Sequence, residues 1–188
     1  YETTDEDLAD GFETIRKHRK IVEEYLLDRG VKLDEVTLRQ VNTDEEERSV
    51  YNENGKYTGS EFEAYRLSQV VQIDSKDLDL IISISREIAE LLEEGLEIRS
   101  YNPKFYYSDL DKLKLNLIEQ ASENGRVRAE QIAKNSKSDL QGLKSAKLGV
   151  FQILGYNSGE SYSWSGTFNT SSRWKTASIT VKMDFEVE

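Results

Sequence analysis

His18 is the one histidine of the chain and the residue type with the widest chemical range. An imidazole binds metals or acts as a general base when carboxylates, thiols or a serine lie beside it. This histidine lies between two basic pairs, residues 16–17 and 19–20, whose charges disfavour both metal binding and an imidazolium. The chain has no cysteine, which excludes thiol nucleophiles, zinc–thiolate sites and disulfides. We therefore expect His18 to pack against its helix or lie on the surface, and we predict no catalytic or metal-binding residue.

The acidic run Asp44–Glu47 could offer carboxylate oxygens to Ca²⁺. However, consecutive residues of an extended segment point apart, and the regular spacing of a calcium loop is absent. We expect this run to be the solvated tip of a hairpin. Phosphate-binding glycine loops and a nucleophile elbow are also missing, so we predict no cofactor. A pair of carboxylates for hydrolysis stays open, because 36 acidic residues are present and none is singled out.

The segment 155–173 is the best candidate for a functional site. It is rich in Ser, Gly and Asn and contains four aromatic residues, Tyr156, Tyr162, Trp164 and Phe168. Long loops in compact domains are usually functional or disordered, and Tyr and Trp among Ser and Gly are typical of adaptable contact surfaces. We predict these four as interaction residues. The alternative is that their rings fold back over the edge of the core, and the sequence leaves both open.

Charge and composition narrow the class of partner. The 188 residues carry 36 acidic against 25 basic side chains, a net charge of −11. Such a surface repels phosphate backbones and anionic lipid, so we expect no nucleic-acid partner. Because the chain starts at Tyr1 and has no long apolar run, we expect any signal or membrane anchor to lie upstream.

Hydrophobic periodicity and turn residues predict three helices and five strands. The predicted helices cover residues 5–29, 74–95 and 108–137, and the predicted strands cover 36–41, 65–73, 96–107, 140–154 and 175–187. Asn54-Gly55 predicts the turn that joins the first two strands. In the last strand, apolar and polar residues alternate without interruption from Ala177 to Val187.

This order of elements predicts an α+β fold in one domain over residues 1–188. With one strand added upstream of Tyr1, the first six elements become the β-α-β-β-α-β core of ferredoxin-like folds. Helices would then cover one face of the sheet. The third helix and the last two strands would extend this core or form a second layer.

Several segments resemble the SIMPL domain family. They are residues 108–114 and 119–133 of the third predicted helix, residues 143–153 (LKSAKLGVFQI), residues 64–71 with 77–79, residues 30–36 after the first helix, and the closing strand 175–187. Their order and spacing cover nearly the whole chain. The family normally starts with a strand ahead of the first helix, which is the strand missing here.

The resemblance implies a bacterial protein exported to the periplasm or cell envelope. Some members resemble ring-forming oligomers, others are linked to oxidative-stress tolerance, and the family has no established catalytic residues to carry over. We therefore expect a non-enzymatic, self-assembling protein. A monomeric module that binds a protein or glycan through the 155–173 loop is the first alternative, and a hydrolase with an unrecognised carboxylate pair is the second.

Overall fold

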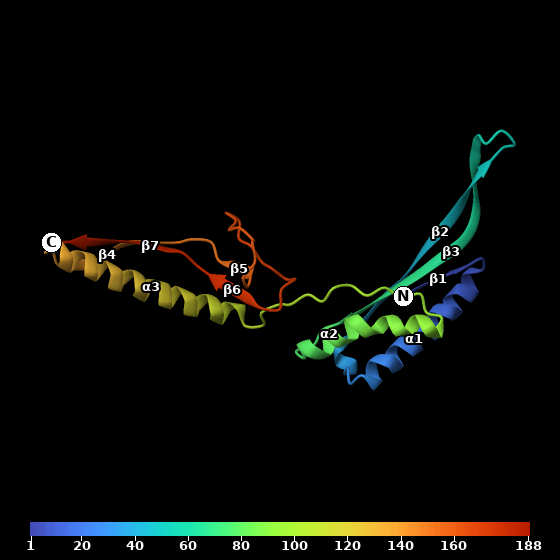
Figure 1. Ribbon diagram of the computed structural model, residues 1–188, viewed down its shortest axis with the longest axis horizontal. Coiled ribbons are helices and arrows are strands. Elements are labelled where there is room, and N and C mark those ends of the chain that lie inside the picture. Colours follow the sequence, from blue (N-terminus) through green and yellow to red (C-terminus); the bar gives the residue numbers. More distant parts are fainter. The chain divides into compact units, whose positions relative to one another are not determined.

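The computed structural model describes residues 1–188. It combines helices with small antiparallel sheets, which confirms the predicted α+β class (Figure 1). The chain forms two compact units, Tyr1–Pro103 and Lys104–Glu188. No helix is long and apolar enough to span a bilayer.

Unit 1 contains strand, helix, two strands and helix in succession. Its elements are β1 (Glu2–Asp5), α1 (Leu8–Asp28), the 3₁₀ turn η1 (Leu33–Glu35), β2 (Val36–Tyr51), β3 (Tyr57–Ile73), α2 (Leu78–Glu87) and the 3₁₀ segment η2 (Ile88–Glu94). Asp7 and Asp77 cap the two helices, since their carboxylates accept from backbone N–H groups of the first turn. Gly95 ends η2 in the left-handed conformation, with φ of 82°.

The sheet of unit 1 has the order β1-β3-β2, with antiparallel neighbours throughout. Glu97 forms an antiparallel bridge to Glu2, on β1. This is the split β-α-β-β-α-β arrangement that the sequence predicted.

Two predicted strands of unit 1 need correction. The first strand lies within the chain, at Glu2–Asp5, where its polar sequence gives no apolar alternation to detect. The strand predicted over 96–107 is reduced to the bridge at Glu97. Its apolar residues change parity midway, and Pro103 cannot donate to a ladder.

One face of the sheet of unit 1 is covered by α1 and by the α2–η2 segment. Apolar residues of both helical segments and of the turns that follow them meet there in a core whose members are at most 4% exposed: Val22, Leu26, Val31, Ile84, Leu91 and Leu96. The opposite face carries polar side chains such as Arg66 and Asp44, which lie directly across from each other. The prediction that helices cover one sheet face is confirmed.

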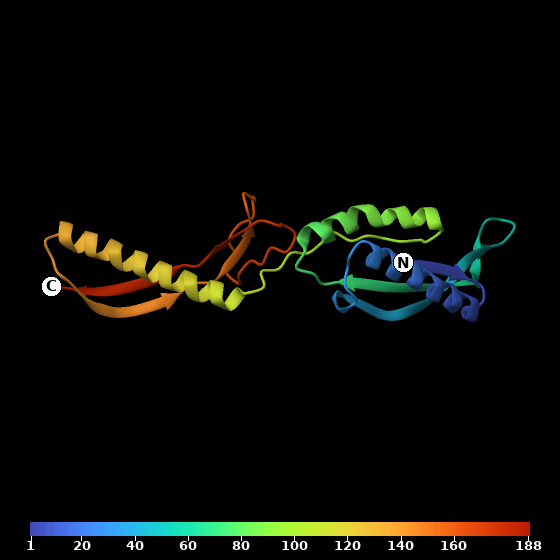
Figure 2. The same ribbon diagram turned by 90° about the horizontal axis from the view of Figure 1, so that it is seen from below.

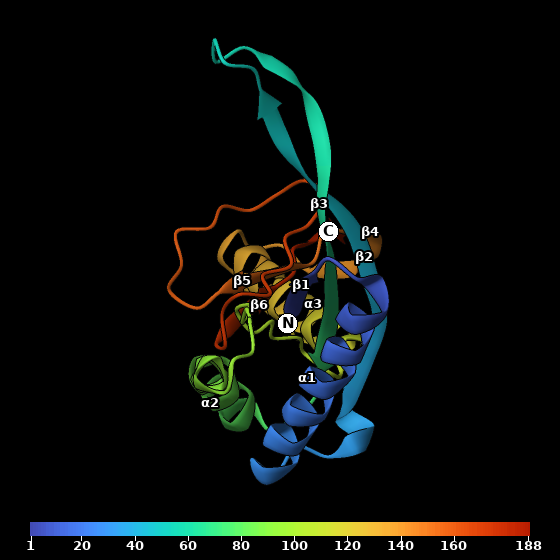
Figure 3. The same cartoon turned by 90° about the vertical axis from the view of Figure 1, so that its right-hand side faces the viewer.

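Beyond the helices, β2 and β3 continue as a two-stranded arm, residues 46–64 (Figures 1 and 3). The acidic run Asp44–Glu47 is therefore part of a strand, and the predicted hairpin tip was placed too early. The tip lies at Asn52–Lys56, where Gly55 has φ of 72°, as the Asn-Gly pair indicated. Apart from the buried Ala64 at its base, neither face of the arm is covered, so its strands show no apolar alternation that a pattern could reveal.

Unit 2 consists of one long helix against a long ribbon (Figure 2). Its elements are α3 (Leu110–Asn135), β4 (Leu140–Leu148), β5 (Gln152–Gly155), β6 (Lys175–Ser178) and β7 (Val181–Val187). β4 pairs with β7, and β5 pairs with β6, so the two predicted strands 140–154 and 175–187 form one interrupted antiparallel ribbon. Met183 of β7 packs so closely on α3 that its Cε fills the space that a Cβ at Gly125 would need.

Candidate interaction surface

The segment 156–174 connects β5 to β6 and is held by backbone bonds to the ribbon. The amide of Ile153 donates to the carbonyl of Thr167 at 2.6 Å, and the carbonyl of Ile153 accepts from Asn169 N–H at 2.8 Å. Near the base, Tyr156 N–H donates to the carbonyl of Trp174 at 2.9 Å. The predicted loop 155–173 thus folds back along β5.

A buried glutamine fixes the middle of this loop. Gln152 is 5% exposed. Its Nε2 donates to the carbonyl of Ser163 at 2.6 Å, and its Oε1 accepts from Thr167 N–H at 2.8 Å. One side chain therefore satisfies polar backbone groups on two separate parts of the loop, which a buried position requires.

A second anchor joins Glu160, Asn169 and Lys175. The Glu160 carboxylate accepts from Gly155 N–H at 2.8 Å and from Asn169 Nδ2 at 2.6 Å. The bond from Gly155 N–H, followed by that from Asn169, lowers the pKa of Glu160 from its ordinary value of 4.5. Lys175 Nζ donates to the carbonyl of Asn169, and burial lowers the pKa of this ammonium.

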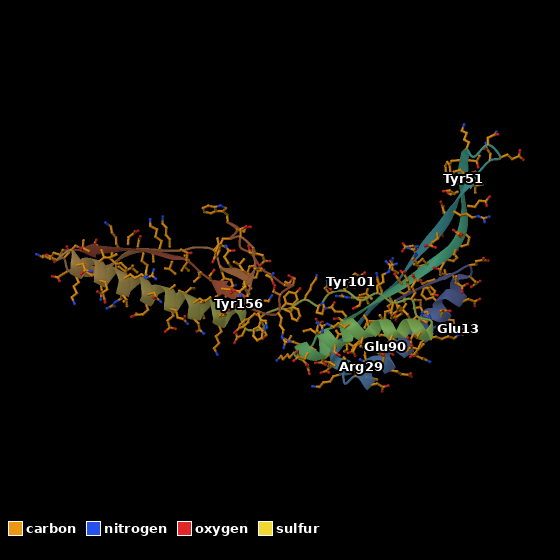
Figure 4. All side chains as sticks on the ribbon, viewed as in Figure 1. Glu13, Arg29, Tyr51, Glu90, Tyr101 and Tyr156 are labelled. Carbon is orange, nitrogen blue, oxygen red and sulfur yellow. The ribbon has the colours of Figure 1, made fainter.

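The four predicted aromatic residues do not share one environment. Phe168 packs against Phe151, with ring centroids 6.1 Å apart, so this ring folds back toward the ribbon in part. Trp164 is 99% exposed, and its ring therefore contacts almost nothing of this chain. Tyr156 and Tyr162 are 63% and 68% exposed. Tyr156 is labelled in Figure 4.

Sequence reasoning missed one further ring at this surface. Trp174 is 73% exposed, and the Arg173 guanidinium lies 5.9 Å from the centre of its ring. The parity of the closing strand could have revealed it, because Trp174 has the parity of the solvent-facing Thr176. We call Tyr156, Tyr162, Trp164, Phe168 and Trp174 the aromatic loop surface.

His18 occupies a packing position, as predicted. It is half-buried and meets the ring of Tyr1 edge-to-face, with centroids 6.4 Å apart. Burial lowers the pKa of the imidazole, and its Nδ1 has no hydrogen-bond partner. No group of three or more His, Asp or Glu side chains is arranged to hold a metal ion.

The acidic run does not converge on one point. Glu46 pairs with Arg66 and Glu47 accepts from Ser60, so their carboxylates are engaged across the arm. At the other end of unit 1, Arg29 bridges Glu87 and Glu90. Arg29 and Glu90 are labelled in Figure 4.

Unit 1 also contains a cavity of about 200 Å³ beside Tyr1. Apolar side chains such as Leu26, Val71 and Ile98 line much of it, together with the paired Glu2 and Arg99.

A family match shows how this chain is related to other proteins. The SIMPL family, described as a protein of unknown function (DUF541), matches residues 1–186. The chain belongs to the SIMPL family. A search of the curated proteins finds no match. The SIMPL match spans both compact units, so the aromatic loop surface lies within the family region.

Proposed function

We propose that this SIMPL protein is a non-enzymatic protein of the cell envelope that self-assembles, with the aromatic loop surface as one of its contacts. The observation that carries the proposal is that strongly exposed aromatic rings lie on a loop that buried polar side chains hold in place. Trp164 is 99% exposed, while Gln152 of β5 and Asn169 within the loop are 5% and 9% exposed.

Physical chemistry favours a contact role for this arrangement. Covering an exposed apolar side chain contributes about 1.5–3 kcal/mol, and Tyr and Trp dominate the binding energy of many interfaces. A loop already fixed by Gln152 and Glu160 loses little conformational freedom on binding, which lowers the cost of association.

The envelope location and a connection to stress tolerance rest on membership of the family. A fold without cysteine does not depend on the redox state of its compartment, which suits export but does not require it.

Two alternatives make different predictions from the same chain. A monomeric module would use the aromatic loop surface to bind a protein or glycan and would lose that ligand, with unchanged mass, when the loop is trimmed. A hydrolase would show a pH-dependent activity that one or two acid-to-amide substitutions abolish.

The test compares the solution mass of three proteins by light scattering over a range of concentrations. They are the unaltered chain, a loop variant (Tyr156→Ser, Tyr162→Ser and Trp164→Ser) and a control variant (Tyr51→Ser and Tyr57→Ser). The control removes two rings of similar exposure, 60% and 56%, from the arm of unit 1. We expect the loop variant alone to form smaller species. Equal masses for all three proteins would contradict a contact role for the loop.

A further inference from the structure

Strand β7 has one edge without a strand partner. It pairs with β4 in a two-stranded sheet and with no other strand. Its seven residues contain no glycine or proline, so nothing in the sequence interrupts an extended edge. Two-stranded sheets are marginal on their own, and exposed edges of this kind readily pair with another chain.

The side of β7 that faces α3 is apolar and only half covered. Val181, Met183 and Phe185 point to this side and are of intermediate exposure. Fully buried hydrophobic residues in unit 2 are few: Ala133, Ile153 and Leu154. A further strand beside β7 would cover more of these side chains.

The solvent face of β7 carries charges of both signs, Lys182, Asp184 and Glu186. In an antiparallel pair of two identical strands, residues directly opposite each other lie on the same face and interact. A two-fold axis at Met183 sets Lys182 opposite Asp184 of the partner subunit, and this pair occurs twice by symmetry. Axes at Lys182, Asp184 or Phe185 each bring like charges together.

We propose that a second copy of this chain pairs its β7 with this β7, antiparallel, about a two-fold axis at Met183. The inference rests on the proposed self-assembly and names its partner and register. Each Lys182 then faces the partner's Asp184 on the solvent side. Val181 lies opposite the partner's Phe185 on the apolar side.

The other edge of the ribbon does not offer the same symmetric contact. The only charged residues of β4 are Lys144 and Lys147, so pairing β4 with its copy offers no pair of opposite charges. Pairing β4 with the β7 of another copy would be head-to-tail, which produces a ring or an open chain and no two-fold dimer.

The experiment uses two full-length variants, Lys182→Glu and Asp184→Lys, each alone and then mixed in equal amounts. Within the chain, Lys182 lies opposite Lys147, so glutamate at position 182 relieves a like-charge pair and preserves the fold. Asp184 accepts from Ser145 at 2.6 Å, so circular dichroism must show that Asp184→Lys is folded.

We expect each variant alone to associate about tenfold more weakly than the unaltered chain, because both cross-strand pairs become like-charge pairs. In the mixture, a dimer of one copy of each variant restores both pairs of opposite charges. The glutamate of Lys182→Glu faces the lysine of Asp184→Lys, and the unaltered Lys182 of one copy faces the unaltered Asp184 of the other, so association returns to within a few-fold of the original. Damage to the fold cannot produce this recovery. Lys147→Glu, on the same face of β4, is the matched control and leaves association unchanged.

The outcomes distinguish the proposed β7 contact from the proposal that the chain self-assembles. If Lys182→Glu associates like the unaltered chain, or the mixture shows no recovery, the β7 contact is wrong while self-assembly stands. If Lys147→Glu weakens association as strongly, the head-to-tail arrangement replaces it. An unaltered chain that is monomeric at all concentrations overturns both proposals. The loop variant described above is expected to retain the dimer formed through β7.

Discussion

Glu160 shows how one carboxylate can fix the geometry of a surface loop. Its two oxygens bind Gly155 N–H and Asn169 Nδ2, on either side of the segment that carries Tyr162 and Trp164. These bonds favour the charged form and hold the pKa of Glu160 below 4.5. The stabilising contribution is therefore present above the pKa of the unfolded chain and is lost as the pH falls through the lower folded value.

We predict that the amide proton shift of Gly155, followed by NMR, titrates with a midpoint below pH 4.5. The shift should respond to the carboxylate that its N–H binds. Glu160→Gln should abolish the titration. A midpoint at or above 4.5 in the unaltered chain would contradict this account.

The hydrogen bonds of Gln152 lead to a second prediction, about hydrogen exchange in the loop. Gln152→Ala removes the partner of the Thr167 N–H and of the Ser163 carbonyl, which lie in half-buried residues. A buried group left without a partner costs about 1–3 kcal/mol, so the loss for these two groups is at most of this size. Hydrogen exchange at Thr167 should become faster in this variant. Gln141→Ala, an exposed glutamine on β4, serves as the control and should leave that amide unchanged.

The candidate rings could be predicted from the sequence, but the residues that hold the loop could not. Tyr156, Tyr162 and Trp164 are conspicuous by type, in a segment otherwise made of small polar residues. Gln152 lies within an apolar strand phrase, and its partners follow 11 and 15 residues later. No local pattern connects residues at such spacings.

At the scale of elements, prediction succeeded where an element buries one face. The stripe of α1 and the alternation of β7 could be recognised because each lies between core and solvent. The arm, residues 46–64, could not be predicted at its full length, since both of its faces meet solvent beyond the buried Ala64 at its base. β1 escaped detection because four polar residues carry no period.

The start of α1 gives a test at this scale. Asp7 accepts from the N–H of Ala9 at 2.7 Å and of Asp10 at 3.2 Å. Asp7→Ala should lower the free energy of unfolding of unit 1 by about 1 kcal/mol, as measured by chemical denaturation. Glu24→Ala, an exposed carboxylate within the same helix, should change it much less. Equal effects would argue against the cap.

At the scale of the whole chain, the two compact units differ in how much core they contain. Unit 1 has a cluster of six buried residues that joins both helices to the sheet. We predict that residues 1–103 fold as a separate fragment, with cooperative thermal unfolding and a dispersed amide spectrum. Noncooperative unfolding of the fragment would show that its core is not sufficient.

Unit 2 presents the opposite case, since it exposes a strand edge, Trp164 and Trp174 around a small core. Association would cover this surface, and the aromatic loop surface and the β7 edge are the two contacts proposed for it. Both proposed contacts lie in Lys104–Glu188, so unit 2 is the part of the chain proposed to assemble.

The most direct test of self-assembly is the solution mass of the unaltered chain, measured by light scattering across a wide range of concentrations. We predict a discrete multimer whose mass does not change with dilution until well below the working concentration. A species of one chain mass at every concentration would contradict self-assembly and would leave the aromatic loop surface as the binding site of a monomeric module.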